Sequence, residues 1–96
     1  MRQKLLRKKK PLVLERREID FIDDMILLLL DQRQELVRDI GKWKRSHRRA
    51  VASPRREREI MLRRLSFLKE STLDPGFVRS LYQLIFRNSR AVQKTA

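Results

Sequence analysis

Apolar side chains recur every three or four residues through the first half of the chain, as they do along one face of an α-helix. No proline interrupts the stretch from Pro11 to about His47, and its apolar positions are Ile19, Ile22, Met25/Ile26, Leu29, Leu36 and Ile40. The spacing predicts one helix of about 36 residues, which would be about 50 Å long. Because a compact domain of this size needs no element that long, we expect a second chain to cover part of it.

Two shorter helices are predicted in the second half, each opened by a polar residue followed by proline. Ser53-Pro54 supplies an N-cap and a first helical residue for a helix that ends near Ser71, with an inner face marked by Ile60/Met61, Leu65 and Leu68. Asp74-Pro75 does the same for a third helix, whose apolar stripe comprises Phe77/Val78, Leu81/Tyr82, Leu84/Ile85 and Val92. The predicted fold class is all-α, with a long, a short and a medium helix.

Gly41 stands inside the predicted long helix, where glycine costs about 1 kcal/mol relative to alanine. A close approach of another helix or access for a substrate would explain this residue, and simple tolerance is the alternative. The sequence alone leaves that choice open.

The 96-residue chain carries a formal net charge of +13, and part of the excess lies ahead of Pro11 in Arg2, Lys4, Arg7, Lys8, Lys9 and Lys10. We interpret residues 1–11 as a basic, flexible tail and residues 12–96 as the folded domain, because the tail has too few apolar residues to fold alone. Such a tail is either a solubilising arm or a contact for RNA, a membrane surface or an acidic partner.

The content of cysteine and histidine, and the absence of long apolar runs, indicate which kinds of site and which cellular location to expect. The chain has no cysteine and one histidine, so neither a disulfide framework nor a multi-histidine metal site is expected. The N-terminal segment lacks the apolar stretch of a secretory signal, and the run from Met25 to Leu30 is too short to span a bilayer. We therefore predict a cytoplasmic protein without a membrane partner.

Two cations interrupt the apolar stripe of the long helix. Arg33 follows Leu29 at core spacing, and Lys44 follows Ile40 in the same way. Eleven residues separate the two cations, which places them on one helix face about 16 Å apart along the axis. A buried charge is costly unless it has a partner, so this face is a candidate binding surface.

The two shorter helices add polar residues at inward positions. Glu57 lies one turn before Met61, and Ser89 and Gln93 continue the third stripe at four-residue spacing. Each long side chain could reach solvent by itself. Taken with Arg33, Lys44 and Arg56, the set predicts a net positive cavity that suits a small molecule with two negative charges.

These residues form an ordered pattern: Arg16-x-x-Ile19-Asp20-x-Ile22-Asp23, Leu29-Leu30-x-x-Arg33, Ile40-Gly41-x-x-Lys44, Pro54-x-Arg56-Glu57 and Ser89-x-x-x-Gln93. From about Leu14 to Gln93 the pattern resembles the all-helical chorismate mutase family. The resemblance implies that three helices from each of two chains interlock into a six-helix homodimer. It also implies that Arg16 enters the site of the other chain. Helix length agrees with this, because 17 residues place Arg16 about 25 Å from Arg33.

The resemblance also implies a role for each site residue. Arg16 of the partner chain and Arg33 would bind the two substrate carboxylates, Arg56 would reinforce the positive field, and Ser89 would help to position a carboxylate. Lys44 and Gln93 would donate hydrogen bonds to the ether oxygen, and Glu57 would accept one from the ring hydroxyl. Ser53 occupies a position where the family usually has aspartate, which leaves the hydroxyl contact there in question.

The expected reaction is the rearrangement of chorismate to prephenate in phenylalanine and tyrosine biosynthesis, with no cofactor and no metal. Two rival functions stay open. An isochorismate pyruvate lyase on the same scaffold would need a similar cationic clamp, and a non-catalytic basic helical protein would bind nucleic acid through its charge. Nucleic acid is the less favoured partner, and the sequence does not reveal whether another pathway enzyme activates this one.

Overall fold

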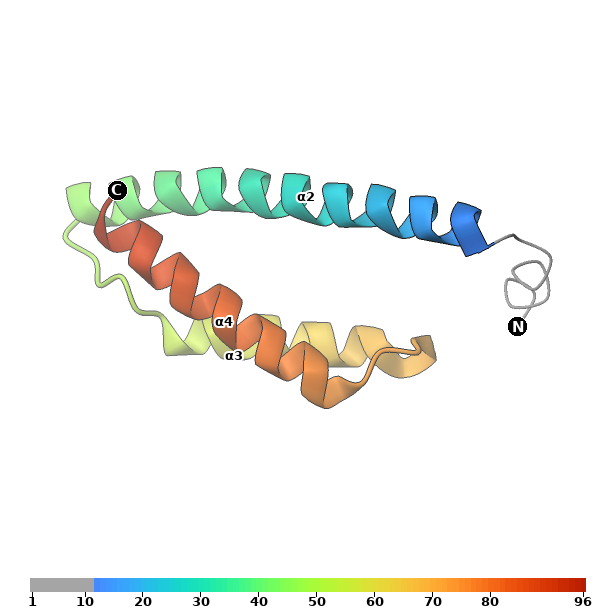
Figure 1. Ribbon diagram of the computed structural model, residues 1–96. Coiled ribbons are helices and arrows are strands. Elements are labelled where there is room, and N and C mark those ends of the chain that lie inside the picture. Colours follow the sequence, from blue (N-terminus) through green and yellow to red (C-terminus); the bar gives the residue numbers. More distant parts are fainter. Residues whose placement is uncertain (1–11) are drawn as a thin grey trace. The chain divides into compact units, whose positions relative to one another are not determined.

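A computed structural model describes residues 12–96, and every regular element in that part of the chain is helical (Figure 1). Helix α2 spans Leu12–Ser46, α3 spans Pro54–Phe67, the 3-10 turn η1 spans Leu68–Glu70, and α4 spans Pro75–Lys94. The predicted long, short and medium helices are confirmed in that order. The predicted basic tail, residues 1–11, lies outside the described residues.

The helix ends agree with the proline signals, with two differences in detail. The predicted second helix leaves α geometry at Phe67 and continues as η1 instead of running to Ser71. Ser53 occupies the N-cap position of α3, but its side chain makes no capping hydrogen bond, so that part of the prediction was wrong. Asp74 does cap α4, because its Oδ2 accepts from the Phe77 backbone N–H at 2.9 Å.

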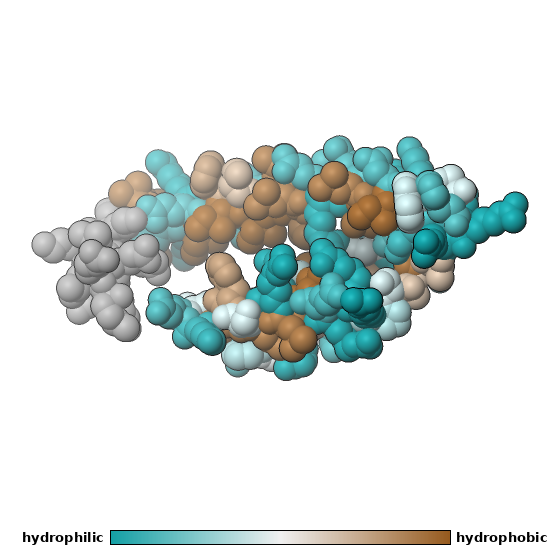
Figure 2. All heavy atoms as spheres, turned by 180° about the vertical axis from the view of Figure 1, so that it is seen from behind, coloured by the Kyte–Doolittle hydropathy of each residue, from teal (hydrophilic) through white to brown (hydrophobic). Residues whose placement is uncertain are grey.

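The chain divides into two compact units, residues 1–33 and residues 34–96. The described part of the first unit consists of the N-terminal two thirds of α2. Its predicted core stripe is exposed in the single chain, with Ile22 at 54% and Leu29 at 57%, and Phe21 on another face is 65% exposed. Figure 2 shows apolar side chains gathered along this helix. Within residues 12–96, none of the helices contains an apolar run that could span a lipid bilayer.

The second unit contains the last turns of α2 together with α3 and α4. Helices α3 and α4 pack against each other, and α4 ends beside the end of α2 (Figure 1). The buried apolar side chains are Val37, Val78 and Phe86, and Ser89 is the buried polar one. Tyr82 packs one turn from Phe86, with ring centroids 6.0 Å apart. This small core fixes α4 against its neighbours, and the polar residues discussed next extend from it.

Candidate functional site

The C-terminal end of α2 is closed by a backbone motif centred on Arg48. Arg48 has a φ of 53°, in the left-handed region that non-glycine residues seldom adopt. The Arg49 N–H donates to the Lys44 carbonyl at 2.7 Å, and the Arg48 N–H donates to the Arg45 carbonyl at 3.3 Å. This pairing is the Schellman motif, which satisfies the last helical carbonyls and reverses the chain. It brings the loop back toward the side chain of Lys44.

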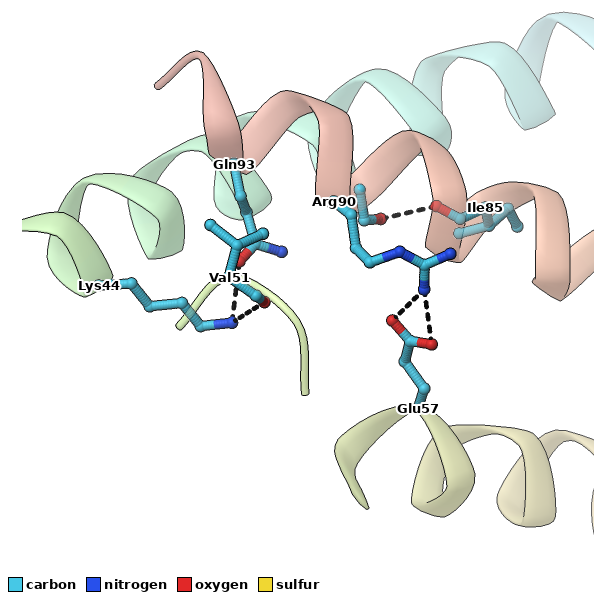
Figure 3. A network of polar contacts seen from close by, with 7 residues as sticks. Lys44, Val51, Glu57, Ile85, Arg90 and Gln93 are labelled. Atoms are coloured by element: carbon cyan, nitrogen blue, oxygen red, sulfur yellow. Dashed lines mark hydrogen bonds and ion pairs between the residues drawn. The ribbon is translucent and has the colours of Figure 1, made fainter. Parts of the chain in front are cut away.

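The Lys44 ammonium joins the returning loop to α4. Its Nζ donates to the Val51 carbonyl at 2.8 Å and to Gln93 Oε1 at 2.9 Å (Figure 3). Both acceptors are neutral, so these contacts orient the ammonium without cancelling its charge. An ammonium has three N–H donors, which leaves one for a ligand. Because lysine can only donate, Gln93 must accept through its oxygen, and its NH₂ group is left to donate elsewhere.

Gly41 permits the close approach that this pairing needs. A Cβ built on Gly41 would lie 2.8 Å from the Gln93 Cα, 2.9 Å from the Gln93 carbonyl oxygen and 2.9 Å from the Ala96 Cβ. These distances are shorter than real Cβ contacts, and two of the three obstacles are backbone atoms of Gln93. The helix-approach explanation is therefore confirmed for Gly41, and the end of α4 lies directly on the α2 backbone. Arg45 strengthens the junction by donating from Nη2 to the Lys94 carbonyl at 3.1 Å.

A second polar cluster links α3 to α4. Arg90 Nη1 donates to both carboxylate oxygens of Glu57, at 2.7 Å to Oε1 and 2.6 Å to Oε2. The side chains are 36% and 27% exposed, so the pair is shielded on part of its surface. Figure 3 shows Arg90 and Gln93 extending from successive turns of α4, with Glu57 reaching up from α3. A hollow of about 250 Å³ adjoins the pair and is lined by Glu57, Gln83, Phe86, Arg87 and Arg90.

Three further predicted site residues belong to the same unit. Ser89 is buried, and its Oγ donates to the Ile85 carbonyl at 2.8 Å within α4. Ser53 is half-buried at the start of α3. Arg56 is more exposed, with 62% of its side chain accessible, and its Nη1 lies 3.7 Å from Glu59 Oε2. The structure thus brings together Lys44 with Gln93, while in this chain Arg56 faces a neighbour on its own helix.

The remaining predicted site residues, Arg16 and Arg33, lie on the part of α2 that belongs to the first unit. Arg16 is exposed and Arg33 is half-buried. Their predicted roles toward a substrate stay predictions.

Sequence reasoning missed two groups at this site. The role of the Val51 carbonyl could not be predicted from the residue type, because every residue has the same backbone oxygen. Arg90 did have a signal, because it follows Val78, Tyr82 and Phe86 at a regular four-residue spacing and so continues the buried face of α4. The site therefore contains two oriented cations and one paired carboxylate in addition to the amide of Gln93.

The chain matches the family model described as chorismate mutase type II over residues 15–94. It is also similar to a chorismate mutase from Methanocaldococcus jannaschii, with 30% identity over 79 residues that cover 82% of this chain and 80% of that protein. The matched range includes every residue of the two clusters.

Longer relatives carry a similar segment. The bifunctional chorismate mutase/prephenate dehydratase of Escherichia coli strain K12 is 34% identical over 84 residues, which cover 88% of this chain and 22% of that protein. The protein of the same description from Buchnera aphidicola is 38% identical over 84 residues, covering 86% of this chain and again 22% of the relative. The present chain thus spans about a fifth of the length of these bifunctional proteins.

Proposed function

The chain belongs to the chorismate mutase type II family, and we propose that it catalyses the rearrangement of chorismate to prephenate, a step toward phenylalanine and tyrosine. The observation that carries this proposal is the contact between Lys44 Nζ and Gln93 Oε1 at 2.9 Å, which joins two helices through residues that are 49 positions apart in sequence. It leaves one ammonium N–H and the amide NH₂ available to the same small ligand.

The chemistry of the rearrangement matches those two donors. The reaction is intramolecular: a carbon–oxygen bond breaks, a carbon–carbon bond forms, and the ether oxygen gains negative charge in the transition state. Hydrogen bonds from Lys44 and Gln93 to that oxygen would be strongest when its charge is greatest, which lowers the barrier. Because the donors are already oriented by Val51 and by each other, little reorganisation is needed as the reaction proceeds.

The other predicted site residues would contribute to recognition of the substrate. Glu57 would accept a hydrogen bond from the ring hydroxyl, and Ser89 would help to place a carboxylate. Arg33 and Arg56 would add positive charge for a substrate that carries two carboxylates. Holding the substrate in a compact, reactive conformer supplies the remaining rate enhancement.

A second copy of the chain completes the proposed site. The first unit exposes many large apolar residues among charged ones along one helix, which is more apolar surface than a lone helix usually leaves in water. A homodimer would cover this surface with the same helix of the partner, and Arg16 would then reach the partner's site to bind one carboxylate. The predicted cytoplasmic location belongs to this proposal as well.

The activity is tested directly by mixing purified protein with chorismate and following the loss of its absorbance and the appearance of prephenate. Isochorismate is assayed in parallel, and binding to RNA and DNA is measured at low and high salt. Turnover of chorismate with dimer mass in solution supports the proposal. Cleavage of isochorismate alone would identify a lyase, and salt-sensitive nucleic-acid binding without turnover would identify a binding protein.

The shared site is tested by complementation between two inactive variants. Arg16→Ala and Lys44→Ala chains are co-expressed with different tags, and the mixed dimer is purified. If Arg16 serves the other chain, one of the two sites in each mixed dimer has both residues intact, and about half of the wild-type activity returns. A mixed dimer as inactive as its parents would show instead that Arg16 acts within its own chain, whereas an Arg16→Ala homodimer as active as the wild type would show that Arg16 has no role.

A further inference from the structure

Arg90 has no role in the mechanism described so far, although it makes the shortest polar contacts at the site. Its Nη1 lies 2.7 Å and 2.6 Å from the two oxygens of Glu57 (Figure 3). It stands one turn after the buried Phe86, on the face of α4 that packs toward α3. The arginine is therefore held by the packing of α4, and the carboxylate that it touches belongs to a different helix.

We propose that Arg90 is a positioning residue for substrate binding, which fixes the carboxylate of Glu57 so that it can receive the hydroxyl of the substrate. This inference rests on the proposed function. Glutamate has three rotatable side-chain bonds, and a carboxylate that is only 27% exposed has limited access to water. A donor that contacts both oxygens restricts the rotation of the carboxylate and its plane.

The contact leaves Glu57 able to bind a ligand. An ionised carboxylate has about four acceptor positions on its two oxygens. A single arginine nitrogen placed between the oxygens uses the side that faces α4, and the remaining positions stay open to a hydroxyl group.

Charge supplies a second reason for this arrangement. The proposed substrate carries two carboxylates, and an unpaired Glu57 beside it would repel them. Arg90 offsets the charge of Glu57 at 2.6 Å, while Lys44 keeps its own charge because it donates to two neutral oxygens. Both effects of Arg90, orientation and charge, act through Glu57. They should disappear together when Glu57 is replaced.

The test is a double-mutant cycle measured on the intact protein with chorismate as the substrate. The variants are Arg90→Gln, Glu57→Gln, the double variant and Arg90→Lys. Arg79→Gln is the control, because Arg79 is an exposed arginine on the same helix. For each protein kcat, KM, melting temperature and dimer mass are measured, so that a loss of folding is separated from a loss of binding.

Arg90→Gln is expected to raise KM about tenfold or more while kcat changes less than about threefold, because the hydroxyl contact is made equally in the bound substrate and in the transition state. The double variant should bind no worse than Glu57→Gln, since the two changes remove one interaction. Arg90→Lys should recover only part of the affinity, because its ammonium keeps the charge but is carried on a shorter, more flexible side chain. Arg79→Gln should behave as the wild type.

Other outcomes overturn the inference in distinguishable ways. If the wild-type protein does not convert chorismate, the proposed function fails and the inference fails with it. If the wild type is active but Arg90→Gln keeps a normal KM, or if the losses multiply in the double variant, Arg90 does not act through Glu57 and the proposed function still stands. If Arg90→Gln does not fold, Arg90→Lys decides. A wild-type KM in that variant would overturn the positioning role, because charge alone would then be enough, and a raised KM would support it.

Discussion

Replacement of Gly41 by alanine should lower kcat strongly while it lowers the free energy of unfolding only a little. The new Cβ would lie 2.8 Å from the Cα of Gln93, whereas ordinary contact begins at 3.4 Å, so the end of α4 must move by about 0.6 Å. Gln93 moves with that backbone. Its hydrogen bond with Lys44, now 2.9 Å, would lengthen to about 3.5 Å, which is at the limit of a useful hydrogen bond.

Two opposing effects determine the stability of this variant. Alanine favours the α2 helix by about 1 kcal/mol relative to glycine, whereas overpacking costs about 1 to 3 kcal/mol. We therefore expect a net loss of about 1 kcal/mol in the free energy of unfolding. Because a displacement of about 1 Å can cost about a hundredfold in rate, the expected loss in kcat is about tenfold to a hundredfold.

The assay combines steady-state kinetics on chorismate with urea unfolding of the same preparations. Gly76→Ala is the matched control for turnover, since its new Cβ would meet only Asp74 Oδ2, at 3.0 Å, at the end of α4 far from Gln93. That oxygen caps α4, so this variant can lose stability without any change at Gln93. The control should keep normal turnover. A kcat for Gly41→Ala within twofold of the wild type would refute the view that this close approach positions Gln93.

Three further predictions concern the same region. Lys44→Ala and Gln93→Ala should each lose about a hundredfold to a thousandfold in kcat while keeping the oligomeric mass of the wild type, and rates close to those of the wild type would remove these residues from the proposed ether contact. Gln93→Glu should be active only in acid, where the new side chain is protonated and can donate; a pH–rate profile identical to that of the wild type would contradict this. Arg48→Gly should raise the free energy of unfolding, measured by urea titration, by up to about 1 kcal/mol, because glycine adopts a φ of 53° without strain. A destabilised variant would mean that contacts of the Arg48 side chain contribute more to stability than the backbone strain costs.

Much of the fold was predictable because periodicity and proline are local signals. Pro54 and Pro75 mark the first residues of α3 and α4, and the apolar rhythm gives the extent of α2. The left-handed turn at Arg48 was not predictable in this way. Arginine has no preference for that conformation, and the turn is formed by hydrogen bonds of the backbone.

The candidate site was predictable to a different degree for each residue. Lys44 and Gln93 interrupt apolar stripes, but the periodicity of separate helices cannot show that the two side chains meet, because that depends on how the helices cross. The resemblance to a family assigned both side chains to one oxygen of the substrate, but their direct hydrogen bond was not predicted. Arg90 was missed since an arginine at the edge of a stripe usually extends into solvent, and only the position of Glu57 on the neighbouring helix shows that it has a partner there.

The exposed apolar surface of the first unit has a consequence for how the protein is made and handled. If a second copy covers that surface, as proposed, folding and assembly are one event, and its rate depends on the concentration of newly synthesised chains. Residues 12–33 of a lone chain would then be a target for chaperones and proteases. Dilution of the purified enzyme would lower its activity per molecule with a midpoint set by the dissociation constant of the dimer.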